Sequence, residues 1–234
     1  MKKTEDARVL SIKSDSCFLA AAVALVTSSV MVNLAGVFGT ETTAEFVMYV
    51  FCTVVMIAAS LFTFVMTVKG FGLVKKSCML DEKNVNYYLG RNLQRLSVAT
   101  VLITVVLTLV TSFIFVLTSQ YSTAEQLSSA DYQAYNNLLN IVAVISIIMM
   151  IFDITLPYMI YLWKIHKSSG GDNFALLTVI IMLVQIIIAS LNSVYSVRGS
   201  DNSFLSSFSV ILEVVEGIAL MLFFLKRRHK TVKE

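Results

Sequence analysis

The chain has 234 residues, of which 57% are hydrophobic and only 14% are charged. An ordinary soluble domain carries about 25% charged residues, so this composition excludes a typical water-soluble protein and indicates an integral membrane protein. The net charge of +3 comes from loops and termini, and it gives no evidence for a nucleic-acid partner.

Six apolar segments are each long enough to cross a hydrocarbon core of about 30 Å, which takes about 20 helical residues. Each must be helical, because lipid offers no partner to free backbone N–H and C=O groups. The sequence therefore predicts an all-α, polytopic protein whose six spans pair as three hairpins: 17–38, 46–68, 97–118, 138–163, 174–196 and 204–225. The fourth span contains the single proline, Pro157, which predicts one kink.

Basic residues are confined to one side of this arrangement. With six spans, 17 of the 18 Lys and Arg fall on the side of both termini, and only Arg198 falls on the other. By the positive-inside rule, residues 1–16 and the basic tail 226–234 are cytoplasmic. We expect the lipid bilayer as a partner, with anionic lipid at the basic tail.

The cytoplasmic connection 69–96 has apolar residues at helical spacing among charged and amide side chains: Val85, Tyr88, Leu89 and Leu93. This pattern predicts an amphipathic helix lying on the membrane, and docking of a cytoplasmic partner is the alternative. On the outer side, Ser122 to Glu125 fit a capping box and Ser129 to Asp131 precede a helical stretch. We therefore expect a short outer helix or an outward extension of the fourth span.

Three acidic residues lie inside apolar spans that contain no Lys or Arg: Asp153, Glu213 and Glu216. A carboxylate near the bilayer centre costs at least ~2.5–3.5 kcal/mol on insertion scales, so such groups typically face water, a cation, a proton path or a partner. Glu213 and Glu216 are three residues apart and share one helix face. Asp153 lies four residues before Pro157, which leaves the Asp153 carbonyl without its usual N–H donor. Permanently protonated, hydrogen-bonded acids are the alternative.

Neutral polar residues mark two further helix faces. Gln185 and Asn192 share one face of the fifth span, where they are candidate neutral ligands. The third span has a threonine face formed by Thr100, Thr104, Thr108 and Thr111. Helix packing is the alternative for both faces, since Ser and Thr bond back to the preceding turn and amides join helices.

The sequence contains no catalytic, metal-binding or phosphate-binding motif. His166 and His229 lie in basic flanks, and the three cysteines have no metal-ligand or disulfide spacing. We therefore expect no enzymatic activity, no cofactor and no metal site. The lack of any N-x-S/T sequence is compatible with a bacterial plasma membrane, and an organelle membrane is the alternative.

The leading hypothesis is a membrane transport protein, or a membrane subunit of a transporter, that moves or couples to a cation, a proton or a positively charged small solute. Asp153, Glu213 and Glu216 would form the charge site, with Gln185 and Asn192 as neutral ligands. The alternative is a non-transporting membrane subunit or sensor whose acids pair with a partner's helix. An oligomeric ion channel, built from copies of this chain, is a third hypothesis.

Overall fold

The computed structural model describes residues 2–38, 42–80, 87–122, 129–168, 172–197 and 203–233. Regular structure within these ranges is entirely helical: α1 (Lys2–Val37), α2 (Thr43–Leu80), α3 (Tyr87–Ser122), α4 (Ser129–Ile151), α5 (Leu156–Ser168), α6 (Asn173–Val197) and α7 (Ser203–Lys233). Six of them are long and apolar enough to cross a membrane. The predicted polytopic all-α fold is confirmed.

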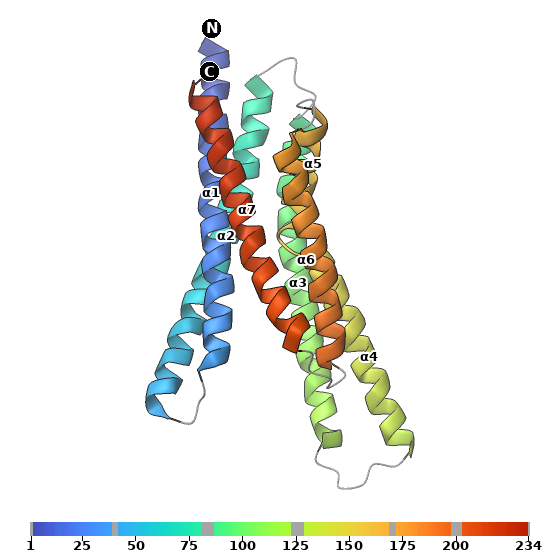
Figure 1. Cartoon of the computed structure of the whole chain (residues 1–234). Coiled ribbons are helices and arrows are strands. Elements are labelled where there is room, and N and C mark those ends of the chain that lie inside the picture. The colour runs from blue at the N-terminus through green and yellow to red at the C-terminus, as the bar shows by residue number, and fades with distance from the viewer. Residues whose placement is uncertain are drawn as a thin grey trace.

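The long helices follow one another around a ring in chain order. Each of the pairs α1–α2, α3–α4 and α6–α7 is in contact, and α2–α3, α4–α6 and α1–α7 contacts join the pairs into a closed circuit. Both termini therefore lie at the same end (Figure 1). There, Arg8 on α1 donates hydrogen bonds to the carbonyl oxygens of Thr231 and Val232 on α7, at 2.9 and 2.8 Å. These bonds satisfy two of the free carbonyls at the end of α7.

The helices continue well beyond the membrane on the basic side. α1 has 36 residues and α2 has 38, so each is about 55 Å long, against a hydrocarbon core of about 30 Å. The prediction of an amphipathic surface helix over 69–96 is wrong. Residues up to Leu80 continue α2, α3 begins at Tyr87, and Leu93 is buried in the core instead of facing lipid.

The approach of α2 to α3 depends on Gly90. A Cβ at this position would lie 2.7 Å from the backbone nitrogen of Lys75, closer than packed side chains permit. The charged stretch is therefore helix-on-helix packing, which hydrophobic periodicity does not distinguish from a surface helix. Val85 lies outside the described residues, as do Arg198 and residues 123–125 of the expected capping box.

The fourth span is broken where only a kink was expected. α4 ends at Ile151 and α5 begins at Leu156, because Pro157 provides no N–H for the continuing helix. The Asp153 carbonyl lacks its usual donor at residue 157, as expected, and accepts a hydrogen bond from the Leu156 backbone N–H at 3.1 Å instead. The outward extension of this span is confirmed, because α4 starts at Ser129.

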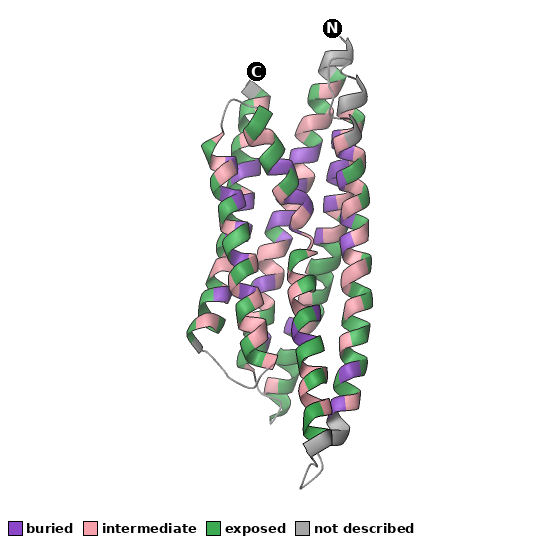
Figure 2. Ribbon diagram, turned by 90° about the vertical axis from the view of Figure 1, so that its right-hand side faces the viewer, coloured by how far each residue is buried: buried purple, intermediate pink, exposed green. Residues whose placement is uncertain are grey.

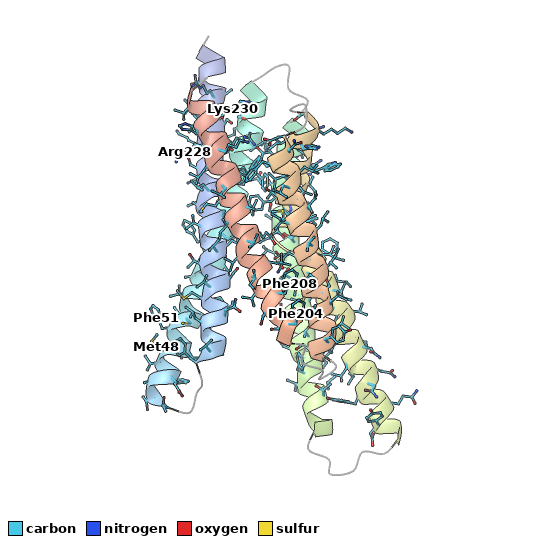
Figure 3. The ribbon with its side chains drawn as sticks, in the orientation of Figure 1. Met48, Phe51, Phe204, Phe208, Arg228 and Lys230 are labelled. Atoms are coloured by element: carbon cyan, nitrogen blue, oxygen red, sulfur yellow. The ribbon has the colours of Figure 1, made fainter. Side chains whose placement is uncertain are left out.

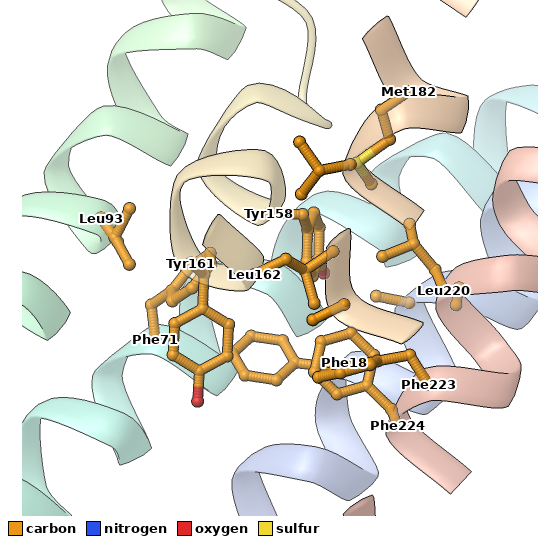
Figure 4. Close-up of a cluster of buried hydrophobic side chains, with 14 of the residues drawn as sticks. Phe18, Phe71, Leu93, Tyr158, Tyr161, Leu162, Met182, Leu220, Phe223 and Phe224 are labelled. Carbon is orange, nitrogen blue, oxygen red and sulfur yellow. The ribbon is translucent and has the colours of Figure 1, made fainter. Parts of the chain in front are cut away.

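Five aromatic side chains, which we call the aromatic cluster, fill the ring at its basic end (Figure 4): Phe18, Phe71, Tyr158, Tyr161 and Phe224. Phe18 lies at the centre, with ring centroids 4.8 Å from Phe71, 4.9 Å from Phe224 and 5.5 Å from Tyr158. α5 brings both tyrosines into this cluster. Figure 2 shows buried residues gathered toward the same end.

Toward the opposite end, the α1–α2 hairpin separates from α7 (Figure 1). Its outer part presents apolar side chains such as Met48 and Phe51 (Figure 3), and these are exposed in the isolated chain. Phe204 and Phe208 at the start of α7 are also exposed and stack on each other at 5.9 Å. Apolar surface of this kind suits contact with lipid chains.

Candidate functional site

The fold brings the three predicted acids into one region, which we call the acid cluster. Glu213 and Glu216 lie on α7, and Asp153 lies in the break between α4 and α5. Asp153 is close enough to interact electrostatically with both glutamates, and the two glutamates interact with each other. Residues sixty positions apart in the sequence therefore share one electrostatic environment.

The three carboxyl groups differ in their hydrogen bonds. Glu213 accepts a bond at 3.0 Å from the Ser29 hydroxyl of α1. Asp153 accepts one at 3.1 Å from the Thr155 hydroxyl. Glu216 is only 4% exposed, yet its Oε1 atom has no hydrogen-bond partner. Of the three acids of the cluster, Glu216 is therefore the one with a buried carboxyl oxygen that lacks a hydrogen-bond donor, which is energetically costly.

No described basic side chain is paired with the acid cluster. Among the described residues, none of the three acids forms an ion pair. Lys226 is the nearest Lys or Arg along α7, ten residues beyond Glu216, a separation of roughly 15 Å along a helix. The described residues therefore supply no positive charge that pairs with the three acids.

The two candidate neutral ligands lie at different depths of α6. Gln185 is twelve residues before Val197, where α6 ends, and Glu216 is thirteen residues after Ser203, where the antiparallel α7 begins. Gln185 and Glu216 are therefore a similar number of turns from the same end of the ring, and the Oε1 atom of Gln185 is also buried without a partner. Asn192 is seven residues further outward, about 10 Å along the helix. By helix length, Gln185 is the closer of the two to the level of Glu216.

Two of the four threonines of the α3 face bond back to their own helix, whereas the buried Thr111 hydroxyl has no hydrogen-bond partner within the described ranges. Thr108 is exposed on the lipid side and donates to the Thr104 carbonyl at 2.8 Å. Thr100 is buried and donates to the Ser97 carbonyl at 3.0 Å. Both hydroxyls bond back to their own helix, which is the packing interpretation of this face.

A second charged group, not predicted from the sequence, lies at the basic end. Asp15 of α1 is fully buried, and its Oδ2 atom is 3.4 Å from Nε of Arg227 on α7. Arg227 also donates a 2.7 Å hydrogen bond to the Tyr161 hydroxyl of α5. We call Asp15, Arg227 and Tyr161 the inner polar cluster. Asp15 lies among polar residues just before the first apolar segment. The sequence therefore predicted it as part of the cytoplasmic segment 1–16 and gave no sign of its burial.

An outer pocket of about 570 Å³ lies where α3 and α6 end and α4 begins. Its lining is largely aromatic and polar: Phe115, Tyr132, Tyr135, Asn136, Leu139, Ser196 and Val197. It is separate from the acid cluster, since none of the three acids lines it.

Within the described ranges, no three His, Cys, Asp or Glu side chains are close enough to hold a metal ion together. The chain matches no protein-family model, no curated protein and no solved structure.

Proposed function

We propose that this protein is a membrane transport protein, or the membrane subunit of a transporter, that moves or couples to a cation, a proton or a positively charged small solute. The observation that carries the proposal is the acid cluster: three intramembrane carboxyl groups brought together with no described basic residue at their depth. In this proposal Asp153, Glu213 and Glu216 provide the charge, and Gln185 adds a neutral oxygen.

The two orphan oxygens support this assignment. Oε1 of Glu216 on α7 and Oε1 of Gln185 on the adjacent α6 are both among the buried acceptors without donors. An unpaired buried acceptor costs about 1–3 kcal/mol. A proton would neutralise the Glu216 carboxyl, and a hydrated cation or an ammonium group would supply a positive charge and donors there. Asn192, outside the acid cluster, would act at most along the outer approach.

The test is uptake into proteoliposomes containing the purified protein, with a pH gradient and a panel of alkali and organic cations. Glu216→Gln, Glu213→Gln and Asp153→Asn should each abolish cation- or pH-dependent uptake. Asp6→Asn, which neutralises an exposed acid of α1, is the matched control and should leave uptake intact. Unchanged uptake in all three acid variants would refute the coupling role.

A second candidate function is a non-transporting membrane subunit or sensor that balances its acids with a basic residue of a partner helix. The exposed apolar outer part of the α1–α2 hairpin favours it, because a partner helix can cover this surface as readily as lipid. Copurification distinguishes the two. A stoichiometric partner that is lost in Glu216→Gln supports the subunit, and a homo-oligomer that conducts ions supports a channel.

For localisation we propose the plasma membrane of a bacterium, in keeping with the lack of N-x-S/T sequences. The exposed Arg228 of the tail is available for anionic lipid on the cytoplasmic face.

A further inference from the structure

α5 is tied to helices on two sides of the ring by its two buried tyrosines. The Tyr158 hydroxyl is 2.7 Å from the Thr67 hydroxyl of α2. One turn further, the Tyr161 hydroxyl accepts the 2.7 Å hydrogen bond from Arg227 of α7. This short helix of 13 residues therefore bridges the ring at its basic end.

The inner polar cluster holds α1, α7 and α5 together at the same level. Asp15 is fully buried, and neither of its carboxylate oxygens makes a hydrogen bond. Its ion pair with Arg227, at 3.4 Å, is thus the contact that offsets its burial. The Arg227 guanidinium also lies over the Tyr161 ring, 5.3 Å from the centroid, a cation–π contact. The Arg227 side chain is 28% exposed, so the pair joins the buried Asp15 of α1 to a half-buried group of α7.

Phe18 closes the space between these two sets of contacts. Its ring contacts Phe71, Tyr158, Tyr161 and Phe224. Gly70 lets the ring lie against α2, because a Cβ there would collide with it. The aromatic cluster is buried and packs the ring between the acid cluster and the basic end. Its close ring contacts leave this packing to be opened before a hydrated ion at the acids can pass.

The break that precedes α5 lies at the acid cluster itself. Asp153 occupies the break before α5, and Tyr158 and Tyr161 follow on that helix. A charge arriving at Asp153 therefore acts directly on the segment about which α5 can turn, and hinges of a few residues at an element's end are the usual means of such motion.

We infer that α5 is the cytoplasmic gate of the cation path, held closed by the inner polar cluster and the aromatic cluster and opened by rotation about residues 152–155. This inference rests on the proposed function for the identity of the path. It assigns Asp15, Arg227 and Tyr161 a positioning role, in that they hold the gate and do not bind the cation.

The test measures access from the cytoplasmic side and needs no knowledge of the cargo. Val26→Cys places a thiol on α1 eight residues outward of Phe18, against Gly217 and beside Glu216, in a background of Cys17→Ser, Cys52→Ala and Cys78→Ser. A membrane-impermeant maleimide is applied to inside-out vesicles. With the inner polar cluster intact, labelling should be slow. Asp15→Asn and Arg227→Gln should each raise the labelling rate about tenfold, which corresponds to a shift of about 1.4 kcal/mol in a two-state equilibrium.

Two exposed neighbours serve as matched controls, Asp6→Asn on α1 and Arg228→Gln on α7, and both should label at the slow rate. Asp15→Glu keeps a carboxylate for Arg227 and should therefore label at the same slow rate as the protein with Asp15. Tyr161→Phe, which removes one hydroxyl without a cavity, gives a milder increase and keeps the test valid if Arg227→Gln does not fold. Size-exclusion profiles confirm folding.

Unchanged labelling in Asp15→Asn, Arg227→Gln and Tyr161→Phe, together with fast labelling in Phe18→Ala, would overturn the inference, because packing alone would then close the path. The two proposals fail separately. Loss of the labelling effect leaves the uptake test of the acids untouched, and a labelling increase in a protein that moves no cation establishes a gate whose function is not transport.

Discussion

Individual acidic residues play contrasting parts in this protein, and their sequence context explains which of them could be predicted. Asp153, Glu213 and Glu216 stand out because apolar residues surround them. Asp15 has Lys13, Ser14 and Ser16 around it and looks like part of a solvated terminus. Its burial depends on Arg227, more than two hundred residues away, and no local pattern encodes that contact.

We expect the buried Glu216 side chain to lower the free energy of unfolding, because one of its oxygens has no donor. Replacing it by leucine removes a buried oxygen that has no donor, so Glu216→Leu should raise the melting temperature in detergent by a few degrees, about 2–4 °C for each kcal/mol. Ser29→Ala provides the contrast, since it leaves the Glu213 oxygen without its hydrogen bond and should lower the melting temperature. A large drop for Glu216→Leu would mean that Glu216 has a partner in the folded protein.

At the level of helices, the apolar runs predicted six spans, and their type and number are confirmed. Their ends were harder to predict, because hydropathy falls where Lys and Arg enter even if the helix continues. α2 and α3 show this. α2 continues past Lys75 and Lys76, and α3 begins before Arg91 and Arg95. The break in the fourth span was predicted only as a kink, since proline reveals the loss of one N–H but not how neighbouring carbonyls find new donors.

The break should depend on the proline. Pro157→Ala restores the N–H that can bond the Asp153 carbonyl and removes a helix-interior cost of about 3 kcal/mol, so α4 and α5 should tend to join. Spin labels at the exposed Ile148 and Ile160 measure this by pulsed electron resonance. In Pro157→Ala the distance should shift toward roughly 18 Å, the rise of twelve residues in a straight helix. An unchanged distribution would show that packing of α5, not proline, maintains the break.

For the whole molecule, the uneven distribution of charge gives the ring its orientation. The basic end holds both termini, the inner polar cluster and the aromatic cluster, whereas the other end is apolar and more open. The sequence predicted the orientation through the positive-inside rule. It did not predict that the basic end is the tightly packed one, because that follows from contacts of Phe18 on α1 with aromatic residues of α2, α5 and α7.

This orientation is testable by site-directed labelling in intact cells. Phe204→Cys lies at the outer end of α7 and Val232→Cys at its basic end, and both positions are exposed. An impermeant thiol reagent should modify the first in intact cells and the second only after permeabilisation. The cysteine-free chain is the control for background labelling. The reverse pattern would invert the assignment of cytoplasmic and outer ends.

The bonds from Arg8 to the last turn of α7 place the beginning and the end of the chain beside each other on one side of the membrane. Donor and acceptor fluorophores fused to the two ends would accordingly start from high energy transfer. Any solute that moves α7 against α1 would change that transfer in a living cell. The chain's own ends can thus serve to screen for its ligand before the ligand is known.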